Sequence, residues 1–174
     1  MKKIIESRAL AAVVLVICII AALVLCPRRS AKALEDDILE AFRSSPEQYV
    51  NVRSAMQDIS IAAHNFLDAV QSLTGDDEVY GFAVLVALFD EDKDDPFGRF
   101  TPSDVQKAAM YLYNDLHGAD TPKNDAKYYY NQIKSLTQQL ARNEAYADAA
   151  HAYNEKIDKF PMNLFDLRPA MLFD

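Results

Sequence analysis

Three histidines are the first candidates for chemistry in this sequence of 174 residues, because neutral imidazole binds metals and can act as a general base. His64, His117 and His151 are isolated, without the His-Glu-x-x-His or Glu-x-x-His spacing of helical metal sites. His64 and His151 can meet only if the two helices that carry them pack together. A metal between them would also need carboxylate ligands. A metal-dependent enzyme using these two residues is therefore one alternative function.

Acidic residues alternate at Asp90, Asp92 and Asp94, as they do at the start of an EF-hand calcium loop. The remaining positions do not fit, since Asp95 stands where the turn glycine belongs and Thr101 where the bidentate glutamate belongs. The sequence also lacks a glycine-rich phosphate loop and a Gly-x-Ser-x-Gly elbow. We therefore predict a solvated acidic loop, no metal, no cofactor, no catalytic residue and no enzymatic activity.

The charge distribution argues against nucleic acid as a partner. Of the 18 basic and 26 acidic residues, five basic and one acidic lie within positions 1–29. This leaves 13 basic and 25 acidic residues from Ser30 onward, a net charge of −12. Such a surface repels phosphate backbones. Both cysteines, Cys18 and Cys26, lie in the N-terminal segment, so the rest of the chain has no thiol for a disulfide or a zinc site.

An apolar segment from Ala9 to Cys26 predicts a transmembrane anchor within residues 1–29. As a helix its eighteen residues extend about 27 Å, close to the ~30 Å hydrocarbon core of a bilayer. Pro27 and Arg28-Arg29 are expected to end this helix at the interface. The lipid bilayer is thus one predicted partner, and the cell membrane the predicted location. Three basic residues lie on each side, so the side of the membrane that holds the remaining chain stays undetermined.

A second interpretation of this segment is a signal peptide. Ala31-Lys32-Ala33 has the small-x-small form of a signal-peptidase site. Cleavage after Ala33 would release a secreted or periplasmic binding protein.

Residues 30–174 are predicted to form one all-α domain, an antiparallel bundle of long helices. A short helix is expected from Ala31 to about Arg43, and a long one from Pro46 to about Leu73, capped by Ser45. Apolar residues of the long helix recur at alternating steps of 3 and 4, the seam of a coiled coil: Tyr49, Val52, Met56, Ile59, Ala63, Phe66, Val70 and Leu73. A final helix from Thr121-Pro122 to Phe160 has a weaker seam that includes Asn143 and Asn154. The two long helices are expected to pair.

The segment Val79 to Phe89 carries a large apolar surface and is predicted to be a helix, because the sequence offers no second strand to pair with it. If the bundle leaves this segment partly uncovered, it is the best candidate for a protein contact. Phe82, Leu85 and Phe89 are the residues proposed for that surface.

The C-terminal segment resembles the signature of the LemA family. The matching residues are Arg142 and Tyr146, then Tyr153-Asn154, then Phe160-Pro161, followed by an apolar tail that ends near Phe173. The resemblance covers roughly the last 35 residues and the N-terminal anchor. It implies a bacterial protein with one N-terminal transmembrane helix and an antiparallel bundle of long helices. In this resemblance Tyr153, Asn154, Phe160 and Pro161 are structural, since the Phe-Pro pair ends the helix and turns the tail back onto the bundle.

Together these observations predict a single-pass membrane protein of LemA-like type. Its helical bundle would act as a scaffold or protein-interaction module for an unidentified protein partner. Release by cleavage after Ala33 and a metal-dependent enzyme remain the alternatives.

Overall fold

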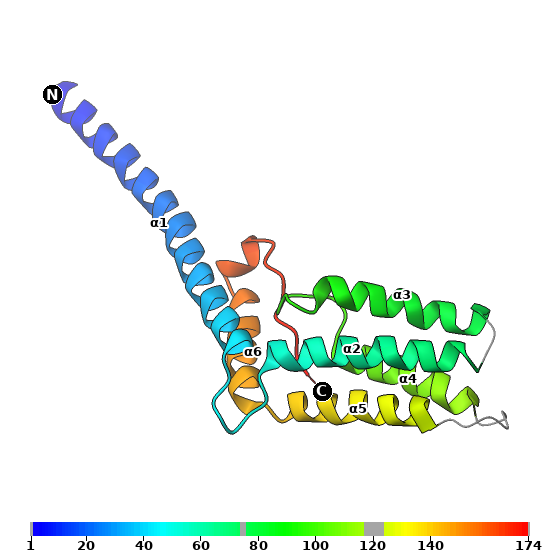
Figure 1. The fold of residues 1–174 in the computed structure, drawn as a ribbon. Helices are drawn as coiled ribbons and strands as arrows, with labels where there is room; N and C mark the ends of the chain where they lie inside the picture. The colour runs from blue at the N-terminus through cyan, green and yellow to red at the C-terminus, as the bar shows by residue number, and fades with distance from the viewer. Residues whose placement is uncertain (1, 74–75, 117–123, 174) are drawn as a thin grey trace.

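The computed structural model describes residues 2–73, 76–116 and 124–173, and these residues contain six α-helices, one short 3₁₀ helix and no strand (Figure 1). The predicted all-α class is therefore confirmed. The expected helix start at Thr121-Pro122 lies outside the described residues. The helices are α1 (Lys2–Arg43), α2 (Val52–Gln71), α3 (Asp76–Asp92), α4 (Pro102–Asp115), α5 (Asn124–Ala141), α6 (Glu144–Ile157) and η2 (Met162–Leu164).

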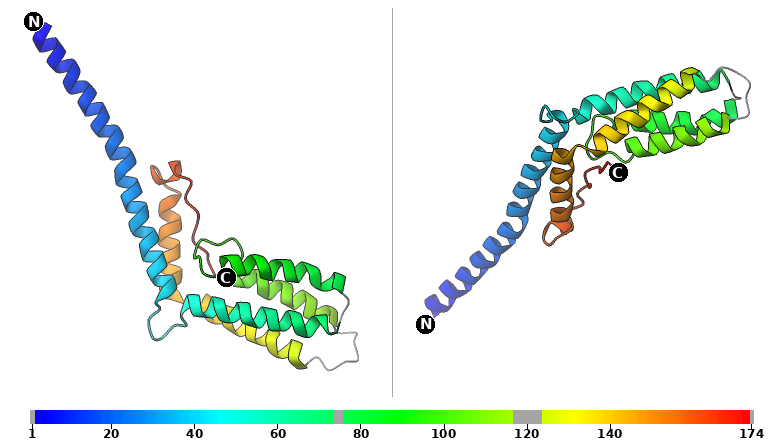
Figure 2. Two further views of the ribbon diagram at one scale, coloured as in Figure 1. Left: turned by 45° about the horizontal axis from the view of Figure 1, so that its top comes forward. Right: turned by 90° about the horizontal axis from the view of Figure 1, so that it is seen from below.

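The helices form two groups. α2, α3, α4 and α5 pack side by side in alternating directions, and each contacts the next while α5 contacts α2; we call them the four-helix unit. α6 lies antiparallel to the C-terminal half of α1, and we call these two helices the α1–α6 pair. The N-terminal half of α1 extends away from everything else (Figure 2).

α1 does not end at Pro27, as the sequence analysis expected. It continues through Pro27 to Arg43, so the apolar segment and the predicted short helix from Ala31 form one helix that crosses the expected boundary at residue 29. A proline inside a helix removes a backbone hydrogen bond. Here the ring of Pro27 is buried, which offsets part of that cost. Side chains of the apolar segment that the structure describes are largely exposed.

The start of α2 also differs from the prediction, because it is capped by Asn51 and not by Ser45. The Asn51 side chain accepts a hydrogen bond from the Ser54 amide at 2.9 Å and donates one to the Arg43 carbonyl at 2.6 Å. One carboxamide thus satisfies backbone groups at the end of α1 and at the start of α2. Residues 44–51 are the connection between the two helices.

The predicted final helix is broken in two at Asn143. Its side-chain oxygen accepts from the Tyr146 amide at 3.1 Å, which makes Asn143 the N-cap of α6. Its Nδ2 donates to the Val50 carbonyl at 3.0 Å and to Ser45 Oγ at 3.2 Å. Asparagine competes well for local backbone hydrogen bonds, which explains why the apolar repeat continues while the helix does not. The buried Asn143 therefore joins the two inter-helix connections.

The predicted seam of α2 is in the core. Six of its eight residues are fully buried, and the exceptions, Tyr49 and Leu73, lie beyond the helix ends. Ala126, Ile133 and Leu140 of α5 are buried too. These two helices pair antiparallel, as expected, although each is shorter than predicted. The apolar periodicity located the core correctly.

The C-terminal tail folds back onto both helix groups (Figure 1). Asn154 forms two hydrogen bonds with the backbone of Ala170, at 2.8 and 3.0 Å, and the Tyr153 hydroxyl donates to the Arg168 carbonyl at 3.2 Å. The Met171 amide reaches the Pro96 carbonyl of the four-helix unit at 2.8 Å. The Phe173 ring stacks on buried Tyr146, with centroids 4.9 Å apart. The expected structural roles of Tyr153 and Asn154 agree with these contacts.

Phe160 does not have the expected role in packing the tail. The Phe160-Pro161 peptide precedes η2, and Pro161 is half-buried, but the Phe160 side chain is 70% exposed. Tyr146 and Tyr153 lie seven residues apart on α6 and are buried, and Phe160 follows Tyr153 after another seven residues. The Phe160 side chain is exposed because α6 ends at Ile157, so the chain has left the helix before Phe160.

Replacing Asn143 tests the joint between the helix groups. Asn143→Ala removes the N-cap of α6 and leaves the Val50 carbonyl without its side-chain donor, so we expect a loss of about 2–3 kcal/mol in unfolding free energy. Urea unfolding of the full chain in detergent, followed by circular dichroism, measures it. The exposed neighbour gives the control, since Arg142→Ala should change stability by less than about 0.5 kcal/mol. Equal effects of the two changes would contradict the assignment.

Substitutions of Asn154 and Phe160 test the contacts of the C-terminal tail. Asn154→Ala removes two hydrogen bonds to the tail backbone and should destabilise the protein by about 1–2 kcal/mol. It should also speed proteolysis between η2 and the C-terminus. Phe160→Ala should lower unfolding free energy in detergent by less than about 0.5 kcal/mol, because its ring is exposed. A larger loss with Phe160→Ala than with Asn154→Ala would refute this description of the tail.

Candidate functional site

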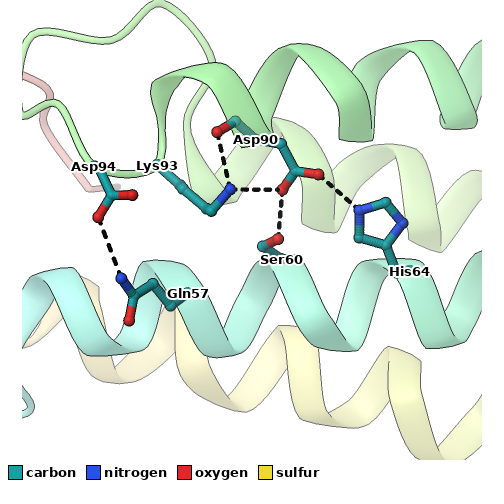
Figure 3. Close-up of polar contacts among 6 residues, drawn as sticks. All are labelled: Gln57, Ser60, His64, Asp90, Lys93 and Asp94. Atoms are coloured by element: carbon teal, nitrogen blue, oxygen red, sulfur yellow. Dashed lines mark hydrogen bonds and ion pairs between the residues drawn. The ribbon is translucent and has the colours of Figure 1, made fainter.

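A polar cluster joins α2 to the end of α3 and gathers the residue types most often used in catalysis (Figure 3). Asp90 is at its centre. Ser60 Oγ donates to Asp90 Oδ1, His64 Nε2 lies 2.7 Å from Asp90 Oδ2, and Lys93 Nζ donates to the Asp90 backbone carbonyl at 3.0 Å. We call Ser60, His64, Asp90 and Lys93 the Asp90 cluster. Ser60 and His64 are one helical turn apart on α2, which directs both side chains toward α3.

The geometry of the Asp90 cluster differs from that of a serine nucleophile site. In such a site the serine hydroxyl donates to a histidine nitrogen, and the carboxylate orients the histidine from its other side. Here Ser60 and His64 both bond to the carboxylate, one to each oxygen. His64 is therefore not placed to take the Ser60 proton. The arrangement is suited to holding α2 and α3 together.

The electrostatics of the cluster favour an ionised Asp90. Partial burial acts to raise the pKa of this carboxyl group, but the hydrogen bonds from Ser60 and His64 and the charge of Lys93 outweigh it. The pKa of Asp90 consequently lies below its ordinary value. A carboxyl group with a lowered pKa is held as the anion at neutral pH. It is poorly suited to donate a proton as a general acid.

The other carboxylates of the acidic loop also have structural partners. Asp94 Oδ1 accepts from Arg53 Nε at 2.7 Å and from Gln57 Nε2 at 3.2 Å, both on α2. Asp92 Oδ2 accepts from the backbone amides of Arg99 and Phe100. The hydrogen bonds to Arg53 and Gln57 also lower the pKa of Asp94. The loop is therefore less solvated than predicted, because its carboxylates hold α3 on α2 and shape the turn before α4.

The histidines proposed as metal ligands are not brought together. His64 belongs to the Asp90 cluster on α2, whereas His151 is an exposed residue of α6 in the α1–α6 pair. Across the parts of the chain that the structure describes, no three His, Cys, Asp or Glu side chains are arranged to hold a metal ion. The alternative in which His64 and His151 meet is not supported, because the break at Asn143 places His151 on α6, outside the four-helix unit.

The apolar segment of α3 has a buried and an exposed face. Phe82 and Phe89, proposed as partner-binding residues, are buried, and Leu85 is half-buried. Phe82 packs edge-on against Phe66 of α2, with ring centroids 5.4 Å apart. The prediction of these residues as a contact surface is therefore wrong. The opposite face carries Tyr80, Val84 and Leu88, which are exposed, and we call these three the α3 outer face.

Sequence reasoning placed the proposed contact residues Phe82 and Phe89 on what the structure shows to be the buried face of α3. Because apolar residues occur all around this helix, periodicity did not indicate which side packs on α2. Sequence reasoning also missed the contact between Ser60 and Asp90, which lie 30 residues apart and meet only through the packing of α2 on α3. The four-residue spacing of Ser60 and His64, which places both on one face of the helix, was the signal that the sequence offered.

Comparisons of the chain with protein-family models, curated proteins and solved structures gave no match. The resemblance to the LemA family therefore stays a prediction. Of the residues that carry this resemblance, Arg142 is exposed just before α6, Tyr146 and Tyr153 are buried, and Asn154 binds the tail.

Removing the charge of Asp90 tests the Asp90 cluster. A carboxylate whose folded pKa is lowered stabilises the fold above its unfolded pKa, about 4, and loses that contribution as pH falls through the folded value. Asp90→Asn should therefore reduce unfolding free energy by about 1–2 kcal/mol at neutral pH, and the difference from the parent protein should shrink below about pH 4.

Urea unfolding at a series of pH values measures this dependence. Asp58→Asn, at an exposed position of the same helix, is the matched control and should have little effect at any pH. A stability loss in Asp90→Asn that is constant from neutral to acidic pH would show that the charge of Asp90 is not what matters.

Proposed function

We propose that this chain is a single-pass membrane protein whose helical bundle binds another protein through the α3 outer face and has no catalytic role of its own. The observation that carries the proposal is that exposed face. Tyr80 is 71% exposed, and Val84 and Leu88 follow it at the spacing of successive helical turns. Apolar residues that form a continuous surface stripe mark interaction sites more often than scattered ones do.

The N-terminal half of α1 supports the membrane part of the proposal. α1 is the one helix in the described ranges that is long and apolar enough to cross a membrane. Its apolar side chains are uncovered by the rest of the chain, as they must be if lipid surrounds them. The continuity of α1 also argues against release after Ala33, because cleavage there would remove Pro27 and Ala31, which are buried.

The absence of catalysis is supported by the chemistry of the Asp90 cluster, in which neither Ser60 nor His64 is activated. The LemA-like relationship is part of the same proposal. It is supported by the way in which Tyr153 and Asn154 hold the returning tail.

The chemistry around the α3 outer face indicates the kind of partner. The chain from Ser30 onward is strongly acidic, with a net charge of −12, and Glu91 at the end of α3 is exposed. An apolar stripe with acidic surroundings suits an amphipathic helix with an apolar face and basic flanks. We therefore propose a basic amphipathic helix of another protein as the ligand.

Site-specific photocrosslinking in the cells that make the protein tests this proposal. A photoreactive phenylalanine analogue at Tyr80 should give one discrete crosslinked protein, and the same analogue at exposed Lys134 of α5 should not. The double change Val84→Glu and Leu88→Glu should abolish the adduct, because it places two charges in the apolar contact.

Lys134→Glu, a charge change on another helix, should leave the adduct intact. The thermal unfolding of each variant has to match that of the parent protein, which separates loss of binding from loss of folding. The proposal fails if Tyr80 and Lys134 give the same adducts, or if the adduct survives in the double variant.

A further inference from the structure

An open groove of about 460 Å³ lies between α1 and the turn that follows α6. Its α1 wall consists of Ala22, Leu23 and Cys26, the last turns of the apolar segment, followed by Pro27. Phe160 and Met162 line the opposite wall. Ala22 lies four residues before Cys26, where the apolar segment ends. Since a helix rises about 1.5 Å per residue, the groove begins about 6 Å before that end. The turn after α6 therefore lies at the same level as the end of the apolar segment.

Two large apolar side chains of this turn are exposed, next to the exposed polar side chains of Lys159 and Asn163. Phe160 is 70% exposed and Leu164, four residues further on, is 71% exposed. Phe165, the next residue, lies under the guanidinium of Arg28, 5.5 Å from ring centroid to Cζ. Phe160 thus lies beside the apolar end of α1, and Phe165 lies beside the first arginine that follows it. The turn therefore runs alongside α1 from the end of its apolar segment to its first arginine.

The charged side chains that line the groove are basic, in contrast to the acidic character of the chain as a whole, while exposed Asp158 and Asp166 flank the turn in sequence. Lys156 and Lys159 border the groove, and Arg28 and Arg29 lie on the facing stretch of α1. Lys159 pairs with Glu155, and Lys156 and Arg29 are exposed. Apolar side chains flanked by exposed lysine and arginine are the composition of segments that lie in a membrane interface.

We propose that the turn at residues 159–165 is a second membrane contact, in which Phe160 and Leu164 enter the interface of the bilayer that α1 crosses. This inference rests on the proposed anchoring of α1. The contact fixes the α1–α6 pair against the membrane surface through two points, the span and the turn. The groove is then occupied by lipid. The four-helix unit, which Asn143 joins to this pair, is held at a set orientation to the membrane.

Fluorescent labels in vesicles test the depth of the turn. In the full chain Cys18 and Cys26 are changed to serine, and one cysteine is placed at Phe160, at Leu15 in the middle of the apolar segment, or at exposed Tyr111 of α4. Each carries an environment-sensitive dye, and the protein is reconstituted in phosphatidylcholine with a minority of phosphatidylglycerol. The vesicles also carry lipids with a nitroxide near the carbonyl end of an acyl chain, which quenches dyes at the interface.

The expected result is quenching at position 160 at least about twofold greater than at position 111, with a blue-shifted emission that position 111 lacks. If position 15 is shielded in the bilayer but position 160 behaves like position 111, the inference is overturned while the anchor stands. If position 15 is as accessible to aqueous iodide as position 111, the anchor and the inference both fail.

Shielding of position 160 from iodide without quenching by the lipid nitroxide would also overturn the inference, because protein would then cover the turn. Thermal unfolding of the three labelled proteins should agree, which is expected since each label replaces an exposed residue.

Discussion

The carboxamide of Asn143 is the contact on which the arrangement of the two helix groups depends. It begins α6 by accepting from the Tyr146 amide, and it binds the connection between α1 and α2 through Ser45 Oγ and the Val50 carbonyl. A buried amide with these partners is specific, since an apolar side chain in its place would leave backbone groups unpaired. The Asn143 side chain therefore links the break before α6 to the connection between α1 and α2. We call this link the joint between the two helix groups.

The C-terminal tail adds further contacts between the same two helix groups. It leaves α6 through η2, binds Tyr153 and Asn154, and reaches both Pro96 and the ring of Tyr146. Burial raises the pKa of Tyr153 to about 12, so its hydroxyl stays a hydrogen-bond donor over the physiological range. We infer a division of labour from this geometry, in which the N-terminal half of α1 and the turn after α6 would contact the membrane and the four-helix unit would present the α3 outer face to a partner.

Patterns that depend on one helix at a time were predictable from the sequence, and contacts between helices were not. The α2 seam was predicted correctly because it is local to one helix. Asn143 was placed in a continuous seam because its neighbours keep the apolar repeat, and the partners of its Nδ2 lie about 95 residues away in the sequence. Pro27 was expected to end α1, but the helix continues through it, and burial of the Pro27 ring offsets part of the cost of the lost hydrogen bond. The buried face of α3 and the Asp90 cluster required the packing of α2 on α3.

The distance between the two helix groups tests the central claim of one defined joint. Spin labels at exposed His151 of α6 and exposed Lys134 of α5, in a full chain with Cys18 and Cys26 changed to serine, allow a pulsed electron resonance measurement in bilayers. The account predicts a single narrow distance distribution, because Asn143 and the tail fix α6 relative to α5. A broad or two-peaked distribution would mean that the groups move independently, and it would contradict the joint described here.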